Sequence, residues 1–152
     1  MNHNDIPPMQ RPEDIPAIHT QADLERFWRM VKGPWGFDEP QLWALVIAGD
    51  DRPTGALFNF AELPREPNDE ALANLLGGCR QVMAEMPGEP SVALLYARPG
   101  NQDLGDADVT WARAINRAAQ QAGVATRPVH FANDALVRVF SPDDLGLGRS
   151  VA

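Results

Sequence analysis

The sequence predicts an α/β fold with a single mixed β-sheet of about five strands flanked by helices, and with an extra N-terminal helix before the sheet. Two observations carry this prediction. Short apolar runs, typical of buried strands, alternate along the chain with longer stretches whose apolar residues recur at helical spacing. The chain has 152 residues, which suffices for one hydrophobic core and not for two.

The two ends of the chain are predicted to lie outside the folded domain, which is expected to span residues 20–140. Residues 1–19 contain four prolines and are expected to form a proline-rich arm, because proline interrupts helices and strand ladders. Disorder suits this arm best, and the alternative is that its isolated apolar side chains dock on the domain or on a second subunit. Residues 141–152 are predicted to be a C-terminal tail.

The first half of the domain is predicted to contain a helix and a strand hairpin. Thr20 is expected to open the helix, and Gly33-Pro34 to end it. Residues 42–47 form a short continuous apolar run, which is typical of a strand covered on both faces. Residues 49–55 are rich in turn-forming residues, so residues 56–60 are expected to return as the second strand.

The second half of the domain is predicted to alternate helices and strands. Asn68 or Asp69 caps a helix with Gly77-Gly78 in its middle, where the helix either approaches the sheet closely or breaks. A strand, a helix and a final hairpin that turns at Asn133-Asp134 are then expected at residues 91–97, 107–122, 125–132 and 135–140. The predicted core includes Trp43, Leu45, Ile47, Leu94 and Val129.

The composition excludes several classes of function. The chain carries 13 basic and 21 acidic residues, for a net charge of −8, and has no run of Lys or Arg, so we expect no nucleic-acid binding. Its longest apolar run, residues 42–48, is too short to span a membrane, and its N-terminus does not resemble a secretory signal. A single cysteine and a composition typical of a GC-rich, actinobacterial-type genome predict a bacterial, cytoplasmic protein.

Few residues are arranged for nucleophilic or cofactor chemistry. Cys79 lies on the apolar stripe of the second predicted helix, where a buried small hydrophobic residue is the simplest interpretation. His130 stands alone on a predicted strand, and the other two histidines lie in the arm. The sequence contains no serine elbow, dinucleotide-binding glycine motif or phosphate loop.

Asp103, Asp106 and Asp108 place three carboxylates within six residues, in a segment that we name the acidic loop. Two interpretations are open. The three carboxylates are able to hold Mg²⁺ or Ca²⁺ through oxygen. Alternatively, Asp106 caps the third predicted helix and Asp108 stabilises its positively polarised end, which is the more frequent use of aspartate in this position.

Four aromatic residues cluster within sixteen positions, namely Trp28, Trp35, Phe37 and Trp43. The glycine and proline residues around Trp35 indicate a loop that presents the indole, so Trp35 and Phe37 are candidate interface residues. Packing of these rings into the core is the alternative.

Residues 94–108 read Leu-Leu-Tyr-Ala-Arg-Pro-Gly-Asn-Gln-Asp-Leu-Gly-Asp-Ala-Asp, which describes an apolar strand, a loop and the start of a helix. This stretch resembles the signature region of the RadC-like branch of the JAB/MPN (JAMM) metalloprotease fold. That family has a strand, His-x-His-Pro-Ser-Gly, a short loop, Ser-x-x-Asp and a long helix. The order of elements over about residues 41–140 is also similar. The resemblance implies a layered architecture like that of the cytidine deaminases.

On this family's pattern the zinc site is incomplete. Tyr96 and Arg98 fall at the positions of the two histidine ligands, and Asp108 alone matches, at the aspartate ligand. The family's catalytic glutamate falls near Asn59, with Glu62 as a less well-aligned candidate. Because a catalytic zinc needs about three protein donors and arginine adds a fixed positive charge, Arg98 is expected to pair with Asp108. Tyr96 and Asn59 are the expected further hydrogen-bond partners of this pair.

The resemblance therefore implies a metal-free, non-catalytic pseudoenzyme that uses no cofactor and serves as a protein-interaction or structural module. Asn59, Tyr96, Arg98 and Asp108 form its vacated site. The acidic domain, its apolar arm and Trp35 offer surfaces suited to a two-fold homodimer or to another protein partner. Two alternatives remain open: a metal-dependent hydrolase that uses the acidic loop, and a binder of small anions or nucleotides in the vacated pocket.

Overall fold

A computed structural model describes residues 15–146 of the chain. Within these residues, helices and strands follow one another in the order α-β-β-α-β-α-β-β. Their bounds are α1 (Gln21–Lys32), β1 (Gln41–Ile47), β2 (Pro53–Phe60), α2 (Asp69–Ala84), β3 (Ser91–Ala97), α3 (Asp106–Ala122), β4 (His130–Ala132) and β5 (Val137–Val139).

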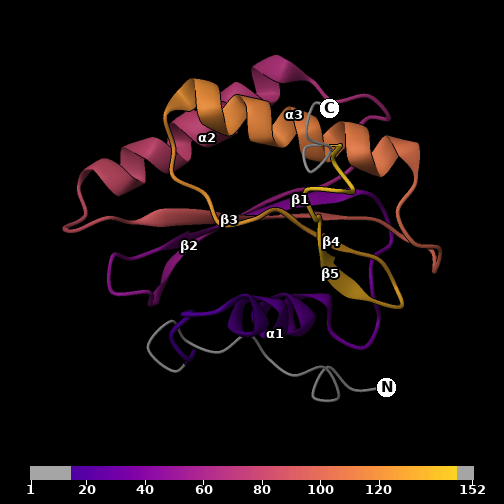
Figure 1. The fold of residues 1–152 in the computed structure, drawn as a ribbon, viewed down its shortest axis with the longest axis horizontal. Coiled ribbons are helices and arrows are strands. Elements are labelled where there is room, and N and C mark those ends of the chain that lie inside the picture. The colour runs from indigo at the N-terminus through magenta and orange to yellow at the C-terminus, as the bar shows by residue number, and fades with distance from the viewer. Residues whose placement is uncertain (1–14, 147–152) are drawn as a thin grey trace.

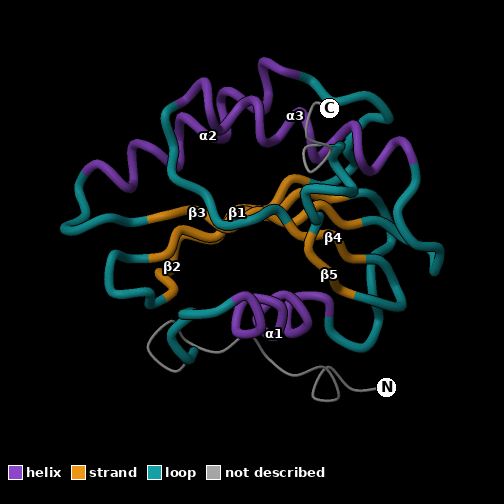
Figure 2. The backbone as a smooth tube through the Cα atoms, viewed as in Figure 1, coloured by secondary structure: helices purple, strands orange, loops and turns teal. Residues whose placement is uncertain are grey.

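The strands form one mixed five-stranded sheet in the order β2-β1-β3-β4-β5. Strand β1 is antiparallel to both β2 and β3, β3 runs parallel to β4, and β4 and β5 form an antiparallel hairpin. Helices α2 and α3 cover one face of the sheet, and α1 lies against the other face (Figure 1, Figure 2). The predicted α/β fold with a single mixed sheet flanked by helices is confirmed.

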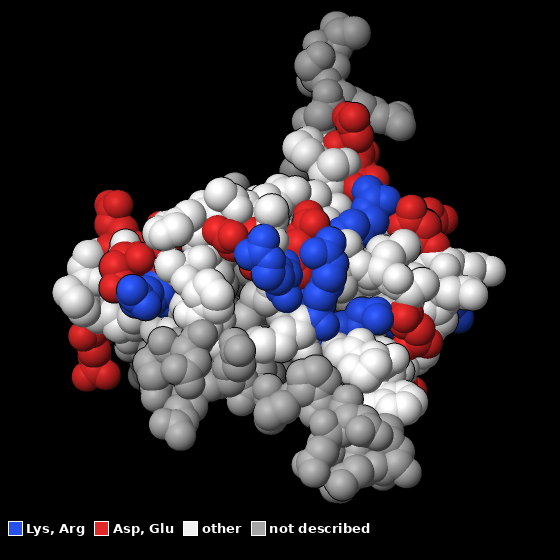
Figure 3. Space-filling model, turned by 90° about the horizontal axis from the view of Figure 1, so that it is seen from below, with Lys and Arg blue, Asp and Glu red and all other residues white. Residues whose placement is uncertain are grey.

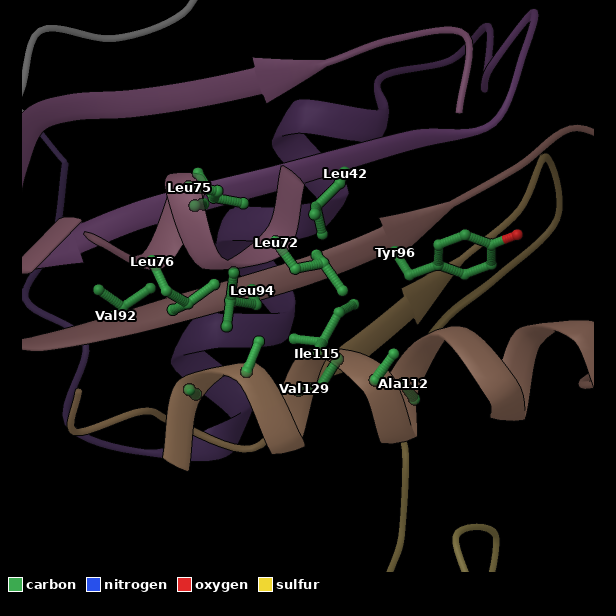
Figure 4. Packing of buried hydrophobic residues seen from close by; sticks show 14 of the residues in the cluster. Leu42, Leu72, Leu75, Leu76, Val92, Leu94, Tyr96, Ala112, Ile115 and Val129 are labelled. Carbon is green, nitrogen blue, oxygen red and sulfur yellow. The ribbon is translucent and has the colours of Figure 1, made fainter. Parts of the chain in front are cut away.

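The larger core lies between the sheet and the pair α2 and α3. Leu72 and Leu76 of α2 and Ile115 of α3 pack with Leu94 of β3 in this core (Figure 4). The helical spacing of the apolar residues turns one stripe of each helix toward the sheet. Each such side chain contributes about 1.5–3 kcal/mol when it is fully removed from water, so this layer is a major source of stability.

The opposite face of the sheet packs against α1. Phe27 and Trp28 of α1 belong to the same buried cluster as Leu45 of β1 and Leu95 of β3. The sheet presents three small residues here, which leave room for the aromatic rings: Ala93, Ala97 and Ala132. Thr20 caps α1, because its side chain accepts a hydrogen bond from the Asp23 N–H while the Asp23 carboxylate accepts one from the Thr20 N–H.

The last described residues before α1 pack on the domain. Ile15 and Ile18 are buried, the Ile18 N–H donates to the Asp51 carbonyl at 2.7 Å, and the Ile18 carbonyl accepts from Arg127 at 3.1 Å. This end of the predicted arm is thus attached to the domain. The rest of the arm, residues 1–14, and residues 147–152 of the predicted tail lie outside the described part of the chain.

Helix α2 runs without interruption through Gly77-Gly78. A methyl group added at either glycine meets no other atom within 4 Å. Neither of the two predicted explanations is therefore right, since the helix neither breaks there nor approaches another element closely. Asn68 caps the helix, as one of the two predicted candidates, by accepting the Ala71 N–H at 2.9 Å.

The final hairpin is shorter than predicted, because β4 and β5 have three residues each. The register to β3 shifts by one residue around Pro128, since Val92 bridges Thr126 whereas Leu95 pairs with His130, and this shift interrupts the ladder that was expected to run from residue 125 to residue 132. An isolated bridge between Val92 and Thr126, together with a hydrogen bond from the Arg127 side chain to Ser91, joins the preceding segment to β3.

Four of the five predicted core residues are buried, namely Leu45, Ile47, Leu94 and Val129. Trp43 is half-buried, and its indole N–H donates to the Gln41 side chain at 3.0 Å. Among residues 15–146, no helix combines the length and the apolar character that a membrane span requires.

His130 is a fully buried polar residue on the α1 side of the sheet. Its Nδ1 atom lies 2.9 Å from the Pro128 carbonyl oxygen, and its Nε2 atom has no hydrogen-bond partner within the described residues. The nearest carboxylate oxygen belongs to Glu25 of α1, 4.0 Å from Nε2. Burial lowers the pKa of His130, so the ring is held in its neutral form.

We expect His130 to make the protein less stable as the pH falls below about 6.5, the ordinary pKa of histidine in an unfolded chain. In that range the unfolded chain binds a proton that the folded protein does not, so the free energy of unfolding decreases, by at most about 1.4 kcal/mol per pH unit. A His130→Gln variant should lose this part of the pH dependence. Urea unfolding of both proteins at several pH values checks the prediction, and parallel curves would contradict it.

Candidate functional site

The candidate site lies at the end of the sheet where β3 leads into α3. Arg98 directly follows β3 and Asp108 is the third residue of α3, so the connecting loop returns the chain to the same place. The Nε atom of Arg98 donates to Oδ1 of Asp108 at 2.8 Å, and its Nη2 atom donates to Oδ2 at 2.9 Å. The predicted pairing of Arg98 with Asp108 is confirmed, in a bidentate form.

The remaining donors of Arg98 bind the loop itself. Nη1 donates to the carbonyl of Pro99 at 3.1 Å, and Nη2 also donates to the carbonyls of Gln102 and Asp103 at 3.0 and 3.2 Å. The guanidinium carbon lies 4.9 Å from the centre of the Phe131 ring, within the range of a cation–π contact. Each nitrogen of the guanidinium therefore donates to a group of the chain, and the hydrogen bond to Asp108 raises the pKa of Arg98.

Asp108 is buried and also serves the first turn of α3. Its Oδ2 atom accepts the Gly105 N–H at 2.8 Å, which makes Asp108 the acidic partner of a capping arrangement. Gly105 occupies the N-cap, so the predicted capping role of Asp106 is wrong. Asp106 is the exposed first residue of the helix. The predicted placement of the Asp108 carboxylate at the positive end of the helix is confirmed.

Tyr96 forms the aromatic base of the site. Its ring stacks on Trp111 and Phe131, with ring centres 5.7 and 6.5 Å apart. Burial raises the pKa of Tyr96 to about 12, with a further contribution from the negative charge of Asp108. Its hydroxyl points away from the aliphatic residues of the core (Figure 4). Backbone groups, not the predicted Tyr96 hydroxyl, complete the hydrogen bonding of the ion pair within the described residues.

Asn59 does not join this site. It lies on the edge strand β2, which β1 separates from β3, and its side chain donates to Gln41 at 3.4 Å. The prediction that Asn59 supports the ion pair is therefore wrong. Glu62, the second candidate for the position of the family's glutamate, lies in an exposed turn with a φ of 54°.

The acidic loop is tied to arginines. The Asp103 carboxylate accepts two hydrogen bonds from Arg138, at 3.1 and 3.0 Å, and Arg138 also donates to Asp144 at 2.6 Å. Residues 15–146 contain no group of three or more His, Cys, Asp or Glu side chains placed to hold a metal ion. The donors at the family's zinc position do not fit zinc either, because the carboxylate of Asp108 already carries a guanidinium counter-charge.

The turn between β4 and β5 lies at the same end of the sheet and binds the loop between β3 and α3. The sequence did not predict these contacts. Asn133 is fully buried, donates to the Gln102 carbonyl at 2.7 Å, and accepts the Leu136 N–H at 2.9 Å. The Asp134 carboxylate accepts the N–H groups of Phe37 at 2.9 Å and of Gly100 at 2.8 Å, which lowers its pKa. The Asn133-Asp134 pair predicted the turn, but no sequence pattern predicted which distant backbone groups its side chains bind.

The two candidate interface residues have different environments. Trp35 is 60% exposed, whereas Phe37 is only 6% exposed and belongs to the core beneath α1, so the predicted interface role of Phe37 is wrong. Gly36 between them has a φ of 72°, and a side chain there would overlap the Asp134 carboxylate. The loop that carries Trp35 is thus joined to the β4–β5 turn by the Phe37–Asp134 hydrogen bond and by the close approach at Gly36.

Cys79 matches its predicted environment, since it is fully buried in the core under α2. Burial raises the pKa of its thiol to about 11, so the thiolate that a nucleophile requires is disfavoured.

Basic side chains on the α1 face lie next to acidic ones (Figure 3). Arg26 contacts Asp23 at 3.1 Å, and Arg29 contacts Glu25 at 3.4 Å. Each of these two arginines thus has a carboxylate of the same helix beside it.

Comparisons with known proteins add no relative. No family model matches the chain, and neither the curated proteins nor the solved structures contain a match.

We expect Arg98→Ala to lower the free energy of unfolding by about 2–4 kcal/mol, because it leaves a buried carboxylate without its counter-charge. Urea unfolding followed by circular dichroism measures the change. The matched control is Arg26→Ala on α1, which breaks an exposed pair and should cost less than about 1 kcal/mol. Equal effects of the two substitutions would show that the Arg98–Asp108 pair does not hold this end of the domain together.

Two glycines should respond to alanine with opposite signs. Gly36→Ala introduces a side chain at positive φ against the Asp134 carboxylate and should destabilise the protein by about 1–3 kcal/mol. Gly77→Ala adds a methyl group to open space in the middle of α2 and should stabilise the protein by about 0.5–1 kcal/mol. Thermal unfolding of both variants checks this contrast, and shifts of the same sign would contradict it.

Proposed function

We propose that the protein is a metal-free, non-catalytic domain of the JAB/RadC-like type, a pseudoenzyme that acts as a protein-interaction or structural module in the bacterial cytoplasm. The Arg98–Asp108 pair carries this proposal, because a guanidinium lies where the resemblance places a zinc ligand. Arginine is always charged in proteins and opposes a cation at this position.

The ion pair also argues against restoring a metal by a small rearrangement. Zinc needs about three protein donors, and Asp108 is the single carboxylate or imidazole among the residues at the family's ligand positions. Moving Arg98 aside would leave its charge without the carboxylate and would break its hydrogen bonds to the carbonyls of Pro99, Gln102 and Asp103. Breaking a largely buried ion pair is costly, so the guanidinium competes strongly with any metal.

The two alternative functions gain no support from the contacts at this site. An anion or nucleotide bound by Arg98 must compete with Asp108 for the guanidinium charge, because the Nε and Nη2 atoms already donate to that carboxylate. A hydrolase built on the acidic loop needs free carboxylates for a divalent cation. Two of its three carboxylates are paired with arginines, Asp103 with Arg138 and Asp108 with Arg98.

The interaction role is supported by Trp35. An exposed tryptophan is a frequent anchor at protein interfaces, and a loop that is already ordered loses little conformational entropy on binding. Trp35 combines both features, since its side chain is exposed while Phe37 and Gly36 fix the loop against Asp134.

Zinc binding tests the proposal. After dialysis against a chelator, the wild-type protein should take up zinc only weakly in a calorimetric titration, because Arg98 holds Asp108. The variant Tyr96→His/Arg98→His supplies two imidazoles beside Asp108 and should bind one zinc ion per chain.

The variant Tyr96→His/Arg98→His/Asp108→Asn is the matched control and should lose that zinc. A wild-type protein that retains one zinc per chain through dialysis would overturn the metal-free proposal. Failure of the folded double variant to bind zinc would remove the support that the resemblance gives to these three positions.

A further inference from the structure

The edge strand β2 has features of a pairing surface. With eight residues it is the longest strand of the sheet, and residues 53–60 include no charged side chain. Within residues 15–146 it pairs with β1 alone and forms one edge of the sheet. Edge strands are usually protected by charged residues, and here Phe60 at the end of the strand is 45% exposed.

The register shows which backbone groups face outward from this edge. The Val46 carbonyl accepts a hydrogen bond from the Thr54 hydroxyl at 2.7 Å, so the even-numbered residues of β1 direct their backbone groups toward β2. The pairing of β1 with β2 then leaves the N–H and C=O groups of Leu57 and Asn59 directed away from β1. These two residues offer two donors and two acceptors at regular strand spacing.

We propose that β2 is a self-association edge, where a second copy of the chain pairs antiparallel about a two-fold axis at Phe58. In this arrangement Leu57 lies opposite Asn59 of the partner subunit and Asn59 opposite the partner's Leu57, which satisfies the outward backbone groups of both. Phe58 lies opposite its own copy, and aromatic pairs of this kind stabilise antiparallel strands. The two sheets become one continuous sheet. This inference goes beyond the function proposed above and does not depend on the vacated zinc site.

Charge complementarity supports a second copy as the occupant. The β1–β2 register shifts by two residues, because Ile47 pairs with Pro53 where the spacing of the other pairs would place residue 55. Because of this shift, Arg52 lies at the height along β1 where residue 54 would lie in a regular strand. Pairing about Phe58 brings the start of β2, which Arg52 precedes, toward the end of the partner's strand, which Glu62 of the partner subunit follows, and the two-fold axis repeats the contact.

Both of these charges are available for such a contact. Arg52 has a 64% exposed side chain, and its contact with Asp50 is long, at 3.9 Å. Glu62 is exposed in the turn after β2. Arg52 and Glu62, at opposite ends of an uncharged strand, are complementary under two-fold symmetry, although Asp50 and Asp51 precede Arg52 and each chain carries a net charge of −8.

Sedimentation equilibrium of the full chain over a wide concentration range tests the proposal. The wild-type protein, with a chain mass of 16.7 kDa, should show a reversible monomer–dimer equilibrium. Asn59→Pro removes one outward N–H from each copy and spares the bonds to β1, so it should weaken the dimer by about tenfold or more. Asn59→Ala keeps the N–H group and is the matched control, with a dimer near wild-type strength.

Exchanging the charges of Arg52 and Glu62 tests whether these two residues face each other across the two copies. Arg52→Glu and Glu62→Arg should each weaken the dimer, and the variant Arg52→Glu/Glu62→Arg should restore it. Circular dichroism and thermal unfolding show whether each variant is folded. A wild-type monomer at the highest concentration, an unchanged dimer in folded Asn59→Pro, or no restoration by the exchange would overturn the proposal. So would a dimer that is lost in Trp35→Ser but kept in Asn59→Pro, since the Trp35 loop would then be the interface.

Discussion

The buried carboxylate of Asp108 is the constraint on which one whole end of the domain depends. A carboxylate that is almost removed from water requires a counter-charge and hydrogen-bond donors at fixed positions. Arg98 supplies the charge and two donors, and the Gly105 N–H supplies a third. Because Arg98 also binds the carbonyls of Pro99 and Gln102, the same contact shapes the loop between β3 and α3 and sets the start of α3 against the sheet.

A second polar centre, the Asn133-Asp134 turn, secures this end from the side of β4 and β5. The Gln102 carbonyl accepts hydrogen bonds from both Arg98 and Asn133, so the two centres share one loop. Asp134 extends the arrangement to the segment before β1 through the Phe37 N–H. Polar residues around Arg98 and Asp134 thus connect three loops, and the position of the loop that carries Trp35 is a consequence.

Local sequence patterns predicted the helices and strands, whereas no sequence pattern predicted the polar contacts between residues far apart in the chain. The apolar run of β3 and the glycine that ends α3 predicted their bounds closely, because strand alternation, helical spacing and caps are local properties. Arg98 and Asp108 were predicted to meet since the resemblance implied a return of the chain after β3. The prediction for Asn59 failed because the order of the strands along the sequence does not say which strands are neighbours in the sheet, or which face of the sheet a side chain reaches. The Phe37–Asp134 contact spans 97 residues, and nothing in either segment identifies its partner.

The end of the sheet that carries Arg98 and Asp108 and the edge strand β2 differ in how many hydrogen-bonding groups remain available to a partner. At the end of the sheet that carries Arg98 and Asp108, the guanidinium, two carboxylates and the Asn133 amide already bind groups of the same chain, so a polar partner there competes with existing contacts. At β2 the outward groups of Leu57 and Asn59 exchange only water for a second strand, and the flanking charges of Arg52 and Glu62 fix its direction. Association through the edge therefore leaves the Arg98–Asp108 network intact. The polar end of the domain can in this way stay unchanged while the sheet edge binds a second copy of the chain.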